Sequence, residues 1–414
     1  MFTRRVVITG LGGLTPVGGT MPETWESLLA GRSGIGPITR FDASALPVRI
    51  AGEVKDFDPL RVMSQKQANR SARFAQLAVA AAQESIIDSG VDLDHEDSSR
   101  IGVAMNTAVA GMGEIAAAED ARGEGGWRAV ASTFVPSVIP NMPASHVSMA
   151  LGLHGPVTAA ALACASGNYA VLDAARMIAM GEADVMVAGG SDASIGPLMF
   201  SGLSMMGALS RNNDHPTEAS RPFDADRDGF VYGEGAVALV VESLDHARAR
   251  GATIYAEVLG GALTSDGFHI AAPEPSGRFA AAAISGALSR SGLSPDDVDY
   301  IAAHGTSTRA NDRTETMAIH TAFGDAADRV AVSSPKSMVG HLIGSAGALS
   351  LAVCALAIRD QAVPPTINLE TPDPECDLDY VPRTAREMPV RIALTNAFGF
   401  GGQNCVVALG AFRG

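Results

Sequence analysis

The sequence feature that most constrains the fold is an order of elements that occurs twice. In the first half, an alanine-rich strand begins at Val157, passes through a turn of small residues around Cys164 and leads into a helix. In the second half, a strand is followed by a glycine-rich turn at 344–347 and an apolar helix at 348–359. Two such βαβ-like halves predict a duplicated α/β core, with the two turns near a pseudo-twofold axis.

Further elements alternate along both halves. We expect strands at 6–9, 101–106, 183–188, 235–242, 254–260, 298–303, 330–333 and 391–396, and helices at 23–30, 74–89 and 279–290. The glycine-rich segment 10–19 predicts a turn. Segments 107–150 and 194–235 show few periodic elements, and we expect the first, which contains breaker prolines, to cap a site or contact another subunit. No low-complexity linker divides the chain, and we place the boundary between a first half, 1–251, and a second half, 252–414.

Charge and composition exclude several classes of protein. The formal net charge of −15 argues against nucleic acid or an anionic membrane as the main partner, because both require a basic face. Four cysteines in 414 residues do not form a disulfide framework and indicate a reducing cytoplasm. No apolar run reaches about 18 residues, so we expect no membrane-spanning helix. The start, Met1 to Arg5, resembles a charged signal region, but the apolar stretch behind it is too short for export.

Three motifs resemble known sites and fail on their spacing. The segment 10–15 follows a strand like a dinucleotide-binding loop, but Thr15 stands where the third glycine should be. The segment 224–229 resembles the start of a calcium loop, yet the twelfth position is Gly235 rather than a carboxylate. The turn around Cys164 lacks the flanking glycines of a hydrolase nucleophile elbow. We interpret the first two motifs as structural turns.

The candidate reactive group is the thiol of Cys164. A cysteine in a turn that opens a helix faces unpaired amides and the positive end of the dipole, so we expect a lowered pKa and a thiolate. His304 and His341 follow strands of the second half, and Lys336 precedes the second of them by five residues. The loop 399–402 can expose backbone N–H groups to an oxyanion. Together these groups favour a cysteine-centred acyl-transfer site.

The residues alone leave alternatives open. Cys164 could be a small core residue, and with the two histidines it could instead hold zinc, although Lys336 would repel a cation. We interpret Cys354, Cys376 and Cys405 as structural or surface residues. The spacing of these groups does not separate a condensation from the hydrolysis of a thioester.

Six segments spread over the chain carry a resemblance to a known family. They are VVITGLGGLTPVG at 6–18, ACASG at 163–167, RPFDADRDGFVYGEG at 221–235, HGTST at 304–308, KSMVGH at 336–341 and NAFGFGG at 396–402. Together they resemble the β-ketoacyl-[acyl-carrier-protein] synthases of the elongating type II kind found in fatty-acid synthesis. The resemblance implies a cytoplasmic dimeric enzyme with a thiolase-like fold, a duplicated α/β fold whose two βαβαβ halves form α-β-α-β-α layers.

The resemblance also implies a mechanism. Cys164 would take an acyl group from the phosphopantetheine arm of acyl carrier protein, with the oxyanion held by the amides of Cys164 and Phe400. Malonyl-carrier protein would bind between His304 and His341, lose CO2 and attack the acyl-cysteine as a carbanion. Lys336 would orient the site electrostatically, and Phe400 would act as a gate. No metal and no cofactor beyond the carrier's own arm would be required.

Further residues follow from the same resemblance. They are Thr306, Thr308 and Gly401 for substrate binding, Val109 and Leu203 for the acyl pocket, Asp312 and Glu315 for support, and Lys66 and Arg70 for carrier docking, unless these two cations lie on a solvated face. Ser350 stands where the family commonly has a glutamate that pairs with the lysine, so Glu315 becomes a candidate partner of Lys336. The alternative within the class is the ketosynthase subunit of a type II polyketide or polyene synthase, paired with a chain-length-factor homologue.

Overall fold

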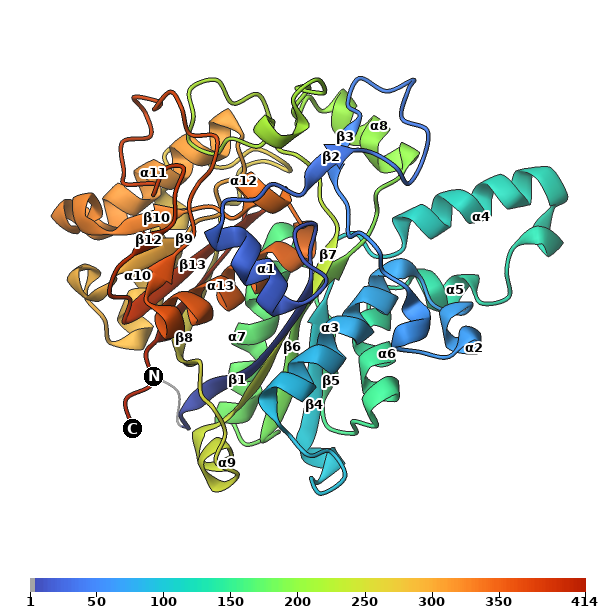
Figure 1. Ribbon diagram of the computed structural model, residues 1–414, viewed down its shortest axis with the longest axis horizontal. Helices are drawn as coiled ribbons and strands as arrows, with labels where there is room; N and C mark the ends of the chain where they lie inside the picture. Colours follow the sequence, from blue (N-terminus) through green and yellow to red (C-terminus); the bar gives the residue numbers. More distant parts are fainter. Residues whose placement is uncertain (1–3) are drawn as a thin grey trace.

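The computed structural model describes residues 4–414 and is organised around one ten-stranded mixed sheet (Figure 1). Residues 1–3, which belong to the signal-like start, lie outside the described residues. The strand order is β10-β9-β13-β14-β8-β1-β7-β6-β4-β5. The bounds are β1 Val6–Leu14, β4 Ile101–Asn106, β5 Val157–Thr158, β6 Val185–Asp192, β7 Gly235–Ser243, β8 Ala256–Ser265, β9 Tyr300–Ala302, β10 Ala331–Ser333, β13 Ile392–Gly399 and β14 Gln403–Gly410.

The sheet consists of two five-stranded sets with the same pairing pattern. From β1 outward, β7 and β6 pair antiparallel and β4 and β5 continue parallel. From β8 outward, β14 and β13 pair antiparallel and β9 and β10 continue parallel. Within residues 4–414, strands of the two sets pair only where Val7 and Ile8 of β1 meet Glu257 and Ala256 of β8. Each set comes from one half of the chain, so the predicted duplication is present in the structure.

Helices complete the layers on both sides of each set. The central layer is α7 (Ser166–Ala179) and α13 (Ala346–Asp360), which pack on each other and on strands of both sets. On the outer faces, α3 (Arg73–Ser89) and α6 (Met142–Leu151) cover the first set, whereas α10 (Arg278–Ser291) covers the second and carries α11 (Arg309–Phe323). The resulting α-β-α-β-α order confirms the predicted fold class.

The remaining elements are short. The helices are α1 Met21–Leu29, α2 Gln65–Ala68, α4 Met112–Gly125, α5 Phe134–Val138, α8 Pro197–Met205, α9 Leu244–Ala249 and α12 Lys336–Val339. The 3₁₀ turns are η1 Pro59–Arg61, η2 Ser98–Arg100, η3 Trp127–Ala129, η4 Ala163–Ala165, η5 Pro216–Glu218, η6 Pro295–Asp297, η7 Gly324–Arg329 and η8 Ile343–Ser345. Two small ladders join β2 Ile35–Pro37 to β3 Ile50–Gly52, and β11 Ala362–Val363 to β12 Arg386–Glu387.

The prediction that 107–150 is irregular was wrong, because this segment contains α4, α5 and α6. Helix α4 projects from the body of the molecule (Figure 1), and all of its residues keep solvent exposure. Its sequence therefore needs no apolar face, and the helical period is missing from the pattern. The segment 194–235 likewise contains α8, which the pattern did not predict.

The turn predicted at 10–19 was wrong in its first part, because β1 continues to Leu14 and only 15–18 form a turn. Gly10 and Gly12 face α3, and a Cβ added to them would stand 2.2 Å and 2.1 Å from carbonyl oxygens of that helix. The helix packs directly on the strand backbone. These glycines serve a close approach rather than a turn.

The segment Ile343–Asp360, which joins η8 to α13, is long and apolar enough by length and composition to cross a membrane. We expected no segment of this kind. In the fold, 89% of it is buried inside the protein, as is usual for a core helix. The four free cysteines are also buried, so the surface alternative for Cys354, Cys376 and Cys405 was wrong.

Candidate active site

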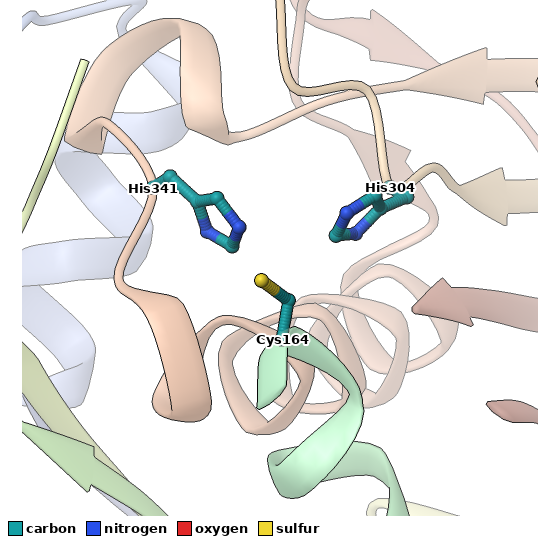
Figure 2. A group of neighbouring side chains, drawn as sticks. All are labelled: Cys164, His304 and His341. Atoms are coloured by element: carbon teal, nitrogen blue, oxygen red, sulfur yellow. The ribbon is translucent and has the colours of Figure 1, made fainter. Parts of the chain in front are cut away.

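Cys164, His304 and His341 meet in one cavity of about 760 Å³. Figure 2 shows the thiol of Cys164, from the turn η4 that precedes α7, directed between the two imidazoles, which come from the second half of the chain. The sulfur and one ring nitrogen of each histidine lie within 4.8 Å of one another. The ring centroids are 5.4 Å apart and the ring planes meet at 83°. All three side chains are buried, so their chemistry is shielded from bulk water.

The turn that presents Cys164 has a counterpart in the second half. Ala163 in η4 has φ +47°, and Ile343 in η8 has φ +52°, a left-handed conformation that side-chain-bearing residues rarely adopt. Each turn leads directly into a central helix, α7 or α13. The hydroxyl of Ser166 locks the first turn, since it donates to Ala163 O at 2.7 Å and accepts from Leu162 N at 2.9 Å. The predicted correspondence of the two turns is therefore present.

The expectation of a thiolate at Cys164 was wrong for this cavity. Burial raises the pKa of Cys164 to about 11. The Lys336 ammonium lowers that pKa, and so do the N–H groups of Phe400 and Cys164 itself, but these effects are smaller than the cost of desolvation. The free site therefore holds a neutral thiol at pH 7. The two amides point at the sulfur, as a pair of oxyanion-hole donors must.

His341 is held as a neutral hydrogen-bond donor. Its Nδ1 accepts the N–H of Ile343 at 3.2 Å, so the ring proton sits on Nε2. Among residues 4–414, Nε2 has no hydrogen-bond partner although it is buried. Burial holds the pKa of His341 well below its usual range, and the Lys336 charge adds to this effect. An unpaired N–H is therefore available to a carbonyl oxygen of a substrate.

His304 is held through its backbone. Glu315 accepts the N–H of His304 at 2.8 Å, and Lys336 Nζ donates to the carbonyl oxygen of His304 at 2.6 Å. Burial holds the pKa of the imidazole well below its usual range, with further lowering by Lys336 and His341. Both rings are thus neutral at physiological pH.

Lys336 is buried, and desolvation lowers its pKa to about 8, while the charge of Glu315 opposes this shift. Within the described part of the chain, Lys336 forms no direct ion pair with an acidic side chain. Ser350 is buried on α13 and brings no charge. The charge of Lys336 acts on Cys164 and on both imidazoles, which disfavours a zinc ion between them.

The loop after β13 covers the cavity. Phe400 lines it, and its side chain is 42% exposed, so this aromatic ring is not packed into the core. Gly401 does not line the cavity, because its N–H turns away and donates to Ile270 O at 2.9 Å. Its φ of +82° requires glycine.

The other predicted residues divide into two groups. Val109, Leu203, Thr306, Thr308 and Glu315 line the cavity. Asp312 lies behind it, where its carboxylate accepts from Thr306 N at 3.0 Å and lies 3.4 Å from the Arg227 guanidinium. Lys66 lies in α2 and Arg70 follows this helix; both are exposed and do not line the cavity.

The sequence reasoning missed two buried polar residues beside this site. Asn396 donates to Glu315 at 3.0 Å and fixes that carboxylate. Asp192 is the last residue of β6, and it lies beyond the end of the strand that was predicted at 183–188. A signal was present, because polar residues at the carboxyl ends of neighbouring parallel strands meet at one edge of a sheet.

Comparison with known proteins agrees with this geometry. Residues 3–247 match the family "Beta-ketoacyl synthase, N-terminal domain" and residues 255–370 match "Beta-ketoacyl synthase, C-terminal domain". A relative from Synechocystis sp., named 3-oxoacyl-[acyl-carrier-protein] synthase 2, is 47% identical and covers 99% of both chains.

Two solved structures are similar over the whole chain. One, described as the ishigamide ketosynthase/chain length factor, has a TM-score of 0.94 and 37% identity, covering 99% of this chain and 100% of that one. The other, a type II PKS acyl-carrier protein in complex with its ketosynthase, has a TM-score of 0.92 and 34% identity, with the same coverage. The chain belongs to the β-ketoacyl synthase family, and its fold is thiolase-like. It is therefore an enzyme, a condensing acyltransferase.

Proposed function

We propose that this protein is a 3-oxoacyl-[acyl-carrier-protein] synthase that extends an acyl chain by two carbons. The observation that carries the proposal is the meeting of one thiol with two neutral imidazoles in a single buried cavity. The Nδ1 of His341 is occupied by the N–H of Ile343, so this ring presents a donor and not a base to the cavity, which suits the formation and capture of an enolate better than the activation of water.

The first step is acyl transfer to Cys164. The thiol attacks the thioester carbonyl of an acyl-carrier protein, and the N–H groups of Cys164 and Phe400 hold the developing oxyanion. The C–S bond to phosphopantetheine breaks, and the thiol proton passes to the departing sulfur. The acyl chain then lies against the apolar side of the cavity, which includes Val109 and Leu203.

The second step is decarboxylation and condensation. The thioester carbonyl of malonyl-carrier protein accepts hydrogen bonds from His304 and from the free Nε2–H of His341. Its C–CO2 bond breaks, and the electron pair forms an enolate that the two donors stabilise. The enolate carbon attacks the acyl carbonyl, the C–S bond to Cys164 breaks, and the departing thiolate takes up a proton from solvent.

The surrounding residues are assigned positioning roles. Lys336 and Glu315 hold the backbone of His304, and the charge of Lys336 helps to keep the imidazoles neutral. Asp312 supports the loop of Thr306 and Thr308, whose hydroxyls lie 2.9 Å apart and are assigned to the pantetheine arm. Phe400 acts as a gate. Gly401 gives its loop the conformational freedom that this movement needs, rather than a substrate contact.

The binding of carrier protein is proposed for an exposed basic pair, Lys66 and Arg70, because the acidic chain as a whole would repel an acidic carrier. The only prosthetic group required is the carrier's phosphopantetheine arm. We propose a cytoplasmic dimer whose chain divides into the halves 1–251 and 252–414.

A second function within the class is the ketosynthase subunit of a type II polyketide or polyene synthase, paired with a chain-length factor. The similarity to a ketosynthase/chain length factor structure favours it, whereas the 47% identity to a 3-oxoacyl-[acyl-carrier-protein] synthase favours the first function. Solution mass with and without the co-expressed neighbour separates the homodimer from the obligate pair.

The test of the proposed function is a condensation assay with malonyl-carrier protein and a series of saturated and unsaturated acyl-carriers. The expected product is a 3-oxoacyl-carrier two carbons longer than the acyl donor, formed by the homodimer. Release of free acid without chain extension would replace the proposal with a thioesterase activity.

A further inference from the structure

We infer that Asp192 is a positioning residue that holds one wall of the acyl cavity and the turn of His341 through a single carboxylate. This inference rests on the proposed function. Asp192 ends β6 in the first half of the chain, fully buried, and accepts four hydrogen bonds. They come from Thr107 Oγ1 at 2.5 Å, Ala108 N at 3.0 Å, Val109 N at 3.2 Å and Gly344 N at 2.7 Å.

Three of these bonds hold the loop that follows β4. In this loop Ala110 has φ +50°, a strained value for alanine, and its N–H donates to Thr107 Oγ1 at 3.0 Å. The Thr107 hydroxyl in turn donates to Asp192. The carboxylate therefore fixes the strained loop that places Ala108 and Val109 against the cavity.

The fourth bond crosses to the second half of the chain. Gly344 follows Ile343, which has a strained φ of +52° and donates its N–H to His341 Nδ1. A Cβ on Gly344 would stand 2.4 Å from Asp192 Oδ2, so the carboxylate sits directly on this backbone. By holding Gly344, Asp192 fixes the turn that assigns the ring proton of His341 to Nε2.

The chemistry of the carboxylate excludes activation of the thiol as its role. The negative charge of Asp192 raises the pKa of Cys164, which opposes thiolate formation. Nor does a cation compensate it, since no lysine, arginine or histidine among residues 4–414 forms an ion pair with Asp192. Burying a carboxylate without a counter-ion costs free energy unless hydrogen bonds to the carboxylate offset that cost. Here these hydrogen bonds join two parts of one active site.

The inference predicts the effect of Asp192→Asn. An amide of the same shape has one acceptor oxygen, so it cannot receive all four donors, which divide between Oδ1 (Thr107 and Val109) and Oδ2 (Ala108 and Gly344). We expect decarboxylation of malonyl-carrier protein to slow by on the order of 10- to 100-fold through misplacement of His341. We also expect the acyl-length preference of Cys164 loading to change, because Val109 moves.

Two variants, each of which alters one side of the Asp192 hydrogen-bond network, separate its contribution to acyl-length preference from its contribution to decarboxylation. Thr107→Val removes the loop donor and is expected to change the acyl-length preference while decarboxylation stays within about twofold of wild type. Gly344→Ala presses a methyl group on the carboxylate and is expected to slow decarboxylation more than loading. These variants also test the inference if Asp192→Asn does not fold.

A matched control is Ser191→Ala. Ser191 precedes Asp192 on the same strand, is equally buried, and donates to Phe74 O at 2.6 Å on the other face of the sheet. The Ser191→Ala substitution should lower thermal stability without altering the acyl-length preference or the decarboxylation rate of the folded enzyme. Loading is measured by mass spectrometry of acyl-Cys164 over a series of chain lengths, and decarboxylation by release of CO2.

If folded Asp192→Asn enzyme keeps the wild-type length preference and the wild-type decarboxylation rate, the inference is wrong. The inference is also wrong if Asp192→Asn loses both activities in parallel and only in proportion to its unfolded fraction, as expected for Ser191→Ala. That result indicates a structural role only. Failure of the wild-type enzyme to condense any acyl-carrier is a different outcome, which contradicts the proposed function itself.

Discussion

The ammonium of Lys336 donates to the carbonyl oxygen of His304 at 2.6 Å, while Glu315 accepts the N–H of the same residue at 2.8 Å. The backbone of His304 is thus held at both ends by groups of opposite charge. Among the acidic side chains, Glu315 opposes the lowering of the Lys336 pKa most strongly, whereas Ser350 brings no charge. Lys336 also places a buried positive charge where it lowers the pKa of Cys164 and of both imidazoles.

Removal of the positive charge of Lys336 should slow the alkylation of the Cys164 thiol. Lys336→Met is expected to decrease the alkylation rate of Cys164 by iodoacetamide several-fold at pH 7, because the pKa of the thiol rises. The pKa of Lys336 is about 8, so the wild-type ammonium is lost above that pH and the difference between the two proteins should narrow. Lys55→Met, a change at an exposed lysine, is the control. Equal rates at pH 7 would contradict the electrostatic role.

Replacement of the nucleophile should separate the two half-reactions. Cys164→Ala is expected to abolish the covalent acyl adduct, and Cys164→Gln, which fills the space of an acyl-cysteine, should leave decarboxylation intact or faster. Intact-mass spectrometry and CO2 release are the two measurements. Cys354→Ala should keep the adduct, since this cysteine is buried in α13 away from the cavity lining. An adduct on any other cysteine would overturn the assignment.

The proton position on His341 predicts a difference between two amide replacements. The amide nitrogen of Gln can reach the place of imidazole Nε2, whereas that of Asn reaches only the place of Nδ1. We therefore expect His341→Gln to keep at least about tenfold more decarboxylation activity than His341→Asn, which corresponds to about 1.4 kcal/mol of transition-state stabilisation. Similar residual activities would show that the Nε2–H donor is not required.

Two glycine substitutions are predicted to have opposite effects on stability, because one glycine lies where β1 packs closely on α3 and the other lies in an open helix. Gly12→Ala would place Cβ 2.1 Å from a backbone carbonyl and should destabilise the fold by about 3 kcal/mol or more. Gly123→Ala, in α4 with nothing within 4 Å, should stabilise it by up to about 1 kcal/mol through helix propensity. Denaturant unfolding measures both. A neutral Gly12→Ala would mean that the sheet and helix can separate freely.

A histidine network away from the active site predicts pH-dependent stability. His246 Nδ1 lies 2.6 Å from Glu242, Nε2 lies 3.1 Å from Glu96, and hydrogen bonding to Glu242 raises the pKa of His246 from 6.5 to about 8. Because the pKa is raised in the fold, this contribution is complete below pH 6.5 and is lost as the pH rises through 8. His246→Gln should therefore cost about 2 kcal/mol at pH 6 and much less at pH 9.

The measurement for this prediction is the free energy of unfolding of wild type and His246→Gln across that pH range. Arg250 also contacts Glu242 and is left unchanged in both proteins. His95→Gln, at an exposed histidine, is the control. A cost that is independent of pH would mean that His246 is neutral in the fold.

Local patterns predicted most of the elements but not their functions or ends. The short, mostly apolar run Ile101–Asn106, which is buried throughout, and the largely apolar helix that became α3 were recognisable from local residue types. Gly10 and Gly12 were misread, because the same glycine that permits a turn also permits a helix to rest on a strand. Helix α4 was missed because it packs on too little of the chain to need an apolar stripe.

By itself, the sequence determined the duplicated α/β class and the identities of Cys164, His304, His341 and Lys336, because residue types and short-range periods are local properties. Only the tertiary structure decided how these groups are charged. Burial from all sides raised the pKa of Cys164, where the helix start alone suggested a thiolate. The fold also brought Asp192 of the first half into contact with Gly344 of the second half. Desolvation and long-range contact depend on residues far apart in the chain, and no local pattern records them.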